Sequence, residues 1–129
     1  MQNSVKEISA QEAWLYLKEH KNAELIDVRT EGEWHRVGYP DLFSIGKQVH
    51  KISWVIAPDM RINVNFIDSL EKTVPMKDKV LLFICKSGYR SSNAASFALE
   101  RGYKNCININ NGFEGVNGWN SYFPIKKGL

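Results

Sequence analysis

The sequence predicts an α/β fold in which a mainly parallel central sheet has helices on both faces. Short apolar runs alternate along the chain with segments in which apolar residues recur at helical spacing. This alternation is typical of parallel strands joined by helices. The 129 residues contain no internal repeat and no linker-like stretch, so a single domain over residues 1–129 is expected.

The first helix has the clearest start signal. Ser9 opens the sequence Ser-Ala-Gln-Glu, a capping-box pattern, and apolar residues then follow on one helical face until the pattern fades near 21–22. A short edge strand is expected before this helix, over residues 5–8. Residues 24–28 form the next expected strand, and 29–32 break it.

Shorter elements are expected in the middle of the chain. Residues 33–37 predict a short helix, and their glycines and proline make 38–48 a loop. A strand near 51–56 follows. Asn63 or Asn65 can then cap a helix that a proline stops.

The last third of the chain predicts a strand, a loop, a helix and a final strand. Residues 79–84 form the first of these strands, and the helical pattern covers 91–101 and stops at Gly102. Residues 106–109 form the final strand, and a turn-rich loop over 110–118 leads into the tail.

Composition argues against several classes of function. The 17 basic residues exceed the 14 acidic ones only slightly and are scattered, which does not favour a nucleic-acid partner. No apolar run is long enough for a membrane span, and no signal peptide is visible. Two cysteines make no disulfide framework, so a cytoplasmic location is expected. The three histidines lack metal-ligand spacing, and no metal is expected.

Residues 85–91, Cys-Lys-Ser-Gly-Tyr-Arg-Ser, are the stretch around which the chain is organised. The cysteine ends an apolar strand, and a glycine-containing loop leads from it into a helix. Loop amides and the unpaired amides of a first helical turn point at one spot, which suits an anion or a thiolate. Cys85 is therefore the candidate nucleophile, whereas Cys106, expected within a strand, is a buried structural thiol.

The other residues of this loop have different expected roles. Arg90 is assigned to catalysis with Cys85, because its guanidinium can orient loop carbonyls or hold an anion through paired N–H groups. Capping the helix is the preferred role for the Ser91 hydroxyl, and Lys86 can equally be a solvated side chain. The residues assigned to substrate binding are Lys86, Ser87, Gly88, Tyr89 and Ser91.

With four residues between Cys85 and Arg90, the loop resembles the active-site loop of the rhodanese-like sulfurtransferases. Asp27-Val28-Arg29 with Glu33 resembles the Asp-x-Arg signature that ends an early strand in that family. By this resemblance, Asp27, Arg29 and Glu33 support the loop through ion pairs and hydrogen bonds. The chain departs from the family's Gly-His-Ile-x-Gly-Ala stretch, and its segment 34–50 looks more like a bacterial single-domain subgroup with Val-Gly-x-Pro-Asp-Leu.

The resemblance implies a rhodanese-like three-layer fold and a sulfurtransferase without a cofactor. A Cys85 thiolate would take the outer sulfur from thiosulfate or a similar small anionic donor, hold it as a persulfide and pass it to a thiol, cyanide or a protein acceptor. Two alternatives stay open, a phosphatase or arsenate reductase of the same fold and a rhodanese-like interaction module. The sequence names neither the physiological donor and acceptor nor a dedicated partner or oligomeric state.

Overall fold

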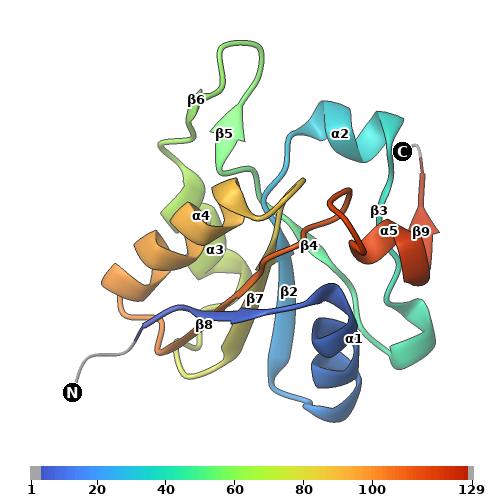
Figure 1. Ribbon diagram of the computed structural model, residues 1–129. Coiled ribbons are helices and arrows are strands. Elements are labelled where there is room, and N and C mark those ends of the chain that lie inside the picture. Colours follow the sequence, from blue (N-terminus) through green and yellow to red (C-terminus); the bar gives the residue numbers. More distant parts are fainter. Residues whose placement is uncertain (1–3, 128–129) are drawn as a thin grey trace.

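The computed structural model, which describes residues 4–127, has a five-stranded sheet at its centre (Figure 1). The strands are β1 (Lys6–Ile8), β2 (Ala23–Asp27), β4 (His50–Lys51), β7 (Val80–Ile84) and β8 (Asn105–Ile109). They lie in the order β1-β8-β7-β2-β4, and every neighbouring pair is parallel. The predicted α/β fold with a mainly parallel sheet is confirmed.

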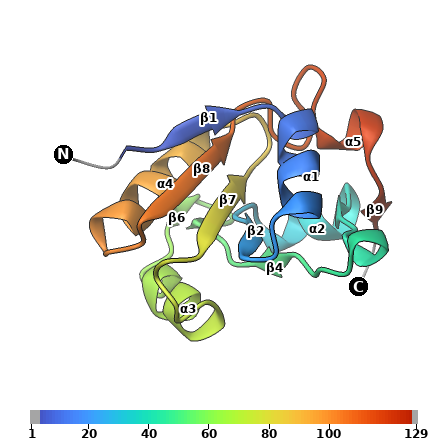
Figure 2. The same ribbon diagram turned by 90° about the horizontal axis from the view of Figure 1, so that it is seen from below.

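Helices cover both faces of the sheet, as Figure 2 shows from below. Because side chains alternate across a strand, Leu82 and Ile84 of β7 enter one core cluster while Leu81, Phe83 and Cys85 enter the other. The first cluster contains residues of α1 (Ala10–Glu19) and α5 (Trp119–Tyr122), and the second contains residues of α3 (Phe66–Thr73) and α4 (Tyr89–Glu100). All five residues of β7 are buried, as expected for a central parallel strand.

Side-chain caps start two of the helices. The predicted capping box of α1 is present, with the Ser9 hydroxyl accepting from the Glu12 amide and the Glu12 carboxylate accepting from the Ser9 amide. A second capping box joins Thr30 to Glu33, so α2 (Glu31–Arg36) begins two residues before the predicted start. At α3, Asn65 occupies the N-cap position but makes no side-chain cap.

The predicted single strand over 51–56 is wrong. β4 ends at Lys51, while β5 (Val55–Ile56) turns away and pairs antiparallel with β6 (Arg61–Ile62) in a hairpin. The amides of Ile52 and Trp54 still donate to the carbonyls of Asp27 and Val28, and after Trp54 the chain pairs with β6 instead.

The predicted loop 38–48 contains short elements. β3 (Tyr39–Pro40) pairs antiparallel with β9 (Ile125–Lys126) near the end of the chain, and a 3₁₀ turn spans Phe43–Ile45. Within residues 4–127, no helix is long and apolar enough to cross a membrane. The same residues contain no cluster of three or more His, Cys, Asp or Glu side chains suited to a metal ion.

Candidate active site

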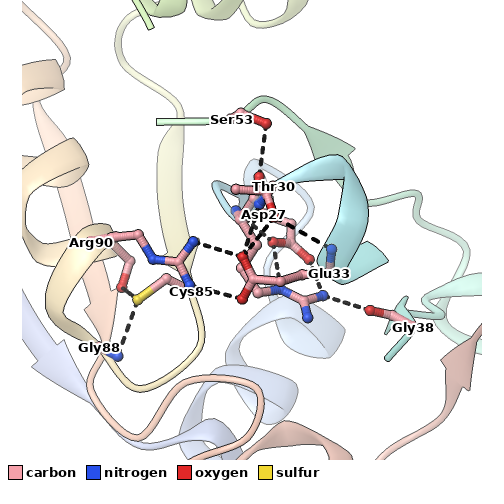
Figure 3. A network of polar contacts seen from close by, with 10 residues as sticks. Asp27, Thr30, Glu33, Gly38, Ser53, Cys85, Gly88 and Arg90 are labelled. Atoms are coloured by element: carbon pink, nitrogen blue, oxygen red, sulfur yellow. Dashed lines mark hydrogen bonds and ion pairs between the residues drawn. The ribbon is translucent and has the colours of Figure 1, made fainter. Parts of the chain in front are cut away.

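Cys85 stands immediately after β7, at the carboxyl end of the central strand. Its side chain is buried, with 1% of the residue exposed, and Sγ accepts a hydrogen bond of 3.1 Å from the Gly88 amide (Figure 3). Gly88 has φ +107°, and a Cβ there would collide with the Asn110 carbonyl. A glycine is therefore required to bring this amide to the sulfur.

Several other amides of the loop have no acceptor within residues 4–127. The described residues accept no hydrogen bond from the backbone N–H groups of Lys86, Ser87, Tyr89, Arg90 or Ser91. The last three belong to the first turn of α4, where no carbonyl of the same helix is available. Lys86, Ser87 and Tyr89 are exposed, so the loop offers free N–H donors beside a buried sulfur. Free N–H groups at the start of a helix favour an anionic ligand.

The segment after β8 packs directly on the cysteine loop. The amides of Phe113 and Glu114 donate to the carbonyls of Cys85 and Lys86 at 2.8 and 2.9 Å. Gly112 has φ +62°, and a Cβ at this position would lie 2.5 Å from the Lys86 oxygen. The predicted turn-rich loop 110–118 thus holds the cysteine loop in place, a role that its sequence did not suggest.

Arg90 directs its guanidinium to the Glu33 carboxylate and makes no hydrogen bond to a loop carbonyl among the described residues. Its Nη1 and Nη2 donate to Glu33 Oε1 and Oε2 at 2.7 and 2.8 Å, so the two side chains join α4 to α2 (Figure 3). Hydrogen bonding to Glu33 raises the pKa of Arg90 against the opposing effect of burial. The pair with Glu33 therefore keeps the guanidinium charged and fixed between α4 and α2.

The Glu33 carboxylate is held ionised. Burial disfavours its charge, but hydrogen bonds from Arg90 and from the Thr30 amide outweigh burial and lower the pKa of Glu33 to about 2. A carboxyl with a depressed pKa stabilises the fold fully above its unfolded value, about 4.3, and loses that contribution as the pH falls toward 2.

We therefore expect Glu33→Gln to remove part of the acid sensitivity of the protein. The wild type should lose more unfolding free energy between pH 5 and pH 2 than the variant, measured by urea denaturation at each pH. Parallel stability curves for the two proteins over this range would contradict the assigned role of the ion pair.

Asp27 and Arg29 form a completely buried pair at the end of β2. Oδ1 of Asp27 accepts from the backbone amide and Nε of Arg29, and Oδ2 accepts from Nη2 at 2.7 Å. Nη2 also donates to the Gly38 carbonyl at 2.7 Å, and the guanidinium lies 4.0 Å from the centre of the Phe113 ring. The pair thus joins β2 to the segments before β3 and after β8.

Ser91 does not cap α4, so the preferred assignment from the sequence is wrong. Gly88 occupies the N-cap position, and Ser91 is the third residue of the helix. Its hydroxyl lies 3.2 Å from Cys85 Sγ and 2.5 Å from Asn108 Oδ1. Asn108, a buried polar residue of β8, was not among the predicted site residues.

Cys106 lies in β8, where the strand register pairs it with Leu81, and is 2% exposed. Burial raises the pKa of its thiol to about 12. A buried thiol with a raised pKa is poorly suited to act as a nucleophile, so Cys106 has the surroundings of a structural residue.

A cleft of about 610 Å³ lies beside the site rather than over it. It is lined by Thr30, Glu31 and Trp34 around α2, together with residues of the β4–β5 connection and of α3. No residue of 85–91 lines it. The chemistry of the cysteine loop therefore identifies the candidate site better than the size of this cleft does.

The sequence matches one family model and several known proteins over most of its length. A family model described as the STR4 middle domain matches residues 5–127. The uncharacterized protein RP600 of Rickettsia prowazekii is 42% identical over 119 residues, covering 89% of this chain and 91% of that protein. Rhodanese-like domain-containing protein 17 of Arabidopsis thaliana is 30% identical over 102 residues, covering 78% of this chain and 61% of that protein.

Two solved structures share the fold along most of the chain. Rv0390 from M. tuberculosis superimposes with a TM-score of 0.86 and 33% identity, covering 98% of this chain and 100% of that one. A polysulfide-sulfur transferase homodimer from Wolinella succinogenes has a TM-score of 0.73 at 22% identity, covering 95% of this chain and 79% of that one. This similarity concerns the fold alone. The chain belongs to the STR4 middle domain family and has the fold of rhodanese-like domain proteins.

Proposed function

We propose that this protein is a sulfurtransferase that carries a sulfane sulfur as a persulfide on Cys85. One observation carries the proposal: the Cys85 sulfur accepts from the Gly88 amide inside a loop whose other N–H groups have no acceptor among the described residues. Those donors are placed to stabilise negative charge on an outer sulfur bonded to Sγ. The protein of the same fold from Wolinella succinogenes is a polysulfide-sulfur transferase, which supports the proposal.

The proposed reaction has two displacement steps. In the first, the Cys85 thiolate attacks the outer sulfur of thiosulfate or a similar small anionic donor. A bond forms from Sγ to that sulfur, the S–S bond of thiosulfate breaks, and sulfite leaves with the electron pair. In the second step, cyanide or a thiolate acceptor attacks the outer sulfur and returns the Cys85 thiolate. Charge balances in both steps without a general acid.

The remaining loop residues act on the bound anion. We assign the backbone amides of Lys86, Ser87, Tyr89 and Ser91 to the donor and to the outer sulfur of the persulfide. Arg90 contributes a fixed positive charge and, through its pair with Glu33, holds the first turn of α4 against α2. The four residues between Cys85 and Arg90 favour sulfur transfer over phosphoryl transfer, because the phosphatase loops of this fold are one residue longer.

The proposal predicts a covalent change that mass spectrometry detects directly. After incubation with excess thiosulfate and removal of small molecules, the intact protein should gain the mass of one sulfur atom, and dithiothreitol should restore the original mass. The persulfide is the only species in the scheme with this mass and this reducibility. An unchanged mass after treatment with both thiosulfate and inorganic polysulfide would contradict the proposed function.

A further inference from the structure

Four side chains form a continuous chain from the edge of the sheet to the reactive sulfur. The register of β1 and β8 places Glu7 opposite Asn108, and Asn108 Nδ2 donates to Glu7 Oε1 at 2.9 Å. Asn108 Oδ1 lies 2.5 Å from the Ser91 hydroxyl, which lies 3.2 Å from Cys85 Sγ. Glu7 is exposed, whereas the other three residues are at most 2% exposed.

The orientation of the Asn108 amide follows from its partners. Nδ2 has two protons, and its two partners, the Glu7 carboxylate and the Gly88 carbonyl at 3.1 Å, only accept. A flipped amide would turn its oxygen toward both of these acceptors. Oδ1 must therefore face Ser91.

This orientation determines the position of the Ser91 proton. Oδ1 of Asn108 can only accept, so the single hydroxyl proton of Ser91 is directed to Asn108 and not to Cys85. The sulfur then faces oxygen lone pairs at 3.2 Å. This contact suits a thiol, which can donate its proton to Oγ, and disfavours a thiolate, which needs a donor. For Ser91 to serve the thiolate, its hydroxyl must rotate and leave a buried amide oxygen unpaired.

The same contact has a different effect on a persulfide. Once Sγ is bonded to a second sulfur, the negative charge lies on the outer atom and no longer on Sγ, the atom that Ser91 contacts in the free enzyme. Sγ needs no donor, and the Ser91 proton remains with Asn108.

We propose that Glu7 and Asn108 are positioning residues that withhold the Ser91 proton from the free Cys85 thiolate and thereby favour the sulfur-loaded enzyme. The effect on loading rests on the proposed function, whereas the effect on the thiolate does not. Weaker stabilisation of the thiolate also makes it a stronger nucleophile toward the donor.

Other charges around the sulfur are the same in every variant suggested below. They are Arg90 of α4 with its partner Glu33 of α2, the buried pair Asp27 and Arg29 at the end of β2, and the exposed Lys86 in the loop. Asn108→Ala and Ser91→Ala change no charge, so the difference between them reports the proton of Ser91. Both Glu7 variants remove the same charge, so the difference between Glu7→Ala and Glu7→Gln reports the hydrogen bond to Asn108.

The first test compares Asn108→Ala with Ser91→Ala by iodoacetamide alkylation of Cys85 against pH, with Cys106 replaced by Ser in all proteins. Asn108→Ala releases the Ser91 proton to the sulfur. The pH at which the alkylation rate of Cys85 is half of its maximum should therefore fall by about one unit, which corresponds to a tenfold larger thiolate population at a pH below that midpoint. Ser91→Ala removes the donor, so the pH of half-maximal alkylation should not fall in this variant. Shifts in the same direction for both variants would show a merely structural network and overturn the inference.

Glu7 provides a variant that is safe for folding, because its side chain is exposed. Glu7→Ala should shift the alkylation profile in the same direction as Asn108→Ala, by a smaller amount. Glu7→Gln should keep the parent profile, because its carboxamide oxygen still accepts from Asn108. A shift in Glu7→Gln equal to that in Glu7→Ala would contradict positioning through the hydrogen bond.

The second test measures the loaded fraction by intact mass at a fixed ratio of thiosulfate to sulfite. Asn108→Ala should hold severalfold less persulfide than the parent. If the parent protein and Asn108→Ala both form the persulfide, and to the same fraction, the inference on loading is overturned. If no protein loads but the alkylation profiles still shift as expected, the proposed function fails while the control of the Ser91 proton stands.

Discussion

Cys85→Ser is expected to reduce thiosulfate:cyanide sulfurtransfer by at least about a thousandfold, because the alcohol that replaces the thiolate cannot hold a transferable sulfur. The measurement is thiocyanate formation at saturating thiosulfate and cyanide. Circular dichroism of the variant should match the wild type, since the substitution changes one atom of a side chain at the end of β7.

Cys106→Ser is the matched control for this substitution. Cys106 is also buried, but the pKa of its thiol is raised to about 12, so almost no thiolate is present at neutral pH. The variant should keep most of its activity. Equal loss of activity in the two variants would contradict the assignment of Cys85 as the nucleophile.

Asp27→Ala is expected to lower the free energy of unfolding by about 3–5 kcal/mol. The substitution would leave the Arg29 guanidinium, whose side chain has no exposed surface, without its carboxylate partner. The measurement is chemical denaturation at neutral pH. Asp27→Ala combined with Arg29→Met should recover much of the loss, because it removes the unpaired charge as well.

The chain offers a control with the same spacing between the partners. Asp59 and Arg61 also form an ion pair two residues apart, but both side chains are 62% exposed. Asp59→Ala should therefore change the free energy of unfolding by no more than about 0.5 kcal/mol. A comparable loss in Asp27→Ala and Asp59→Ala would show that burial does not determine the contribution of the first pair.

Local patterns were sufficient to predict most of the fold. The apolar run of β7 and the capping box at Ser9 depend on neighbouring residues alone, and both are present. The strand predicted over 51–56 failed because its last two residues pair with β6 rather than with β2, and the local pattern does not determine the pairing partner. The sequence Thr-Glu-Gly-Glu at 30–33 is a capping box that could have given the start of α2.

Within the candidate site, too, some features follow from neighbouring residues and others depend on contacts between distant parts of the chain. The positions of Cys85 and of the glycine turn follow from adjacent residues, whereas the pairing of Arg90 with Glu33 joins residues 57 positions apart. The contact of Asn108 with Glu7 spans 101 positions and depends on the register of β1 against β8. One signal was available, because an asparagine within an apolar strand needs a buried partner.

The order of the strands has a consequence for synthesis of the chain. β7 lies between β2, which precedes it in the sequence, and β8, which follows it. Until residues 105–109 have left the ribosome, one edge of β7 has no partner. Its sequence, Val-Leu-Leu-Phe-Ile, has no charge, proline or glycine, so this edge can pair with another nascent chain. The strand that leads into the Cys85 loop is thus also a segment of the chain at risk of aggregation before folding is complete.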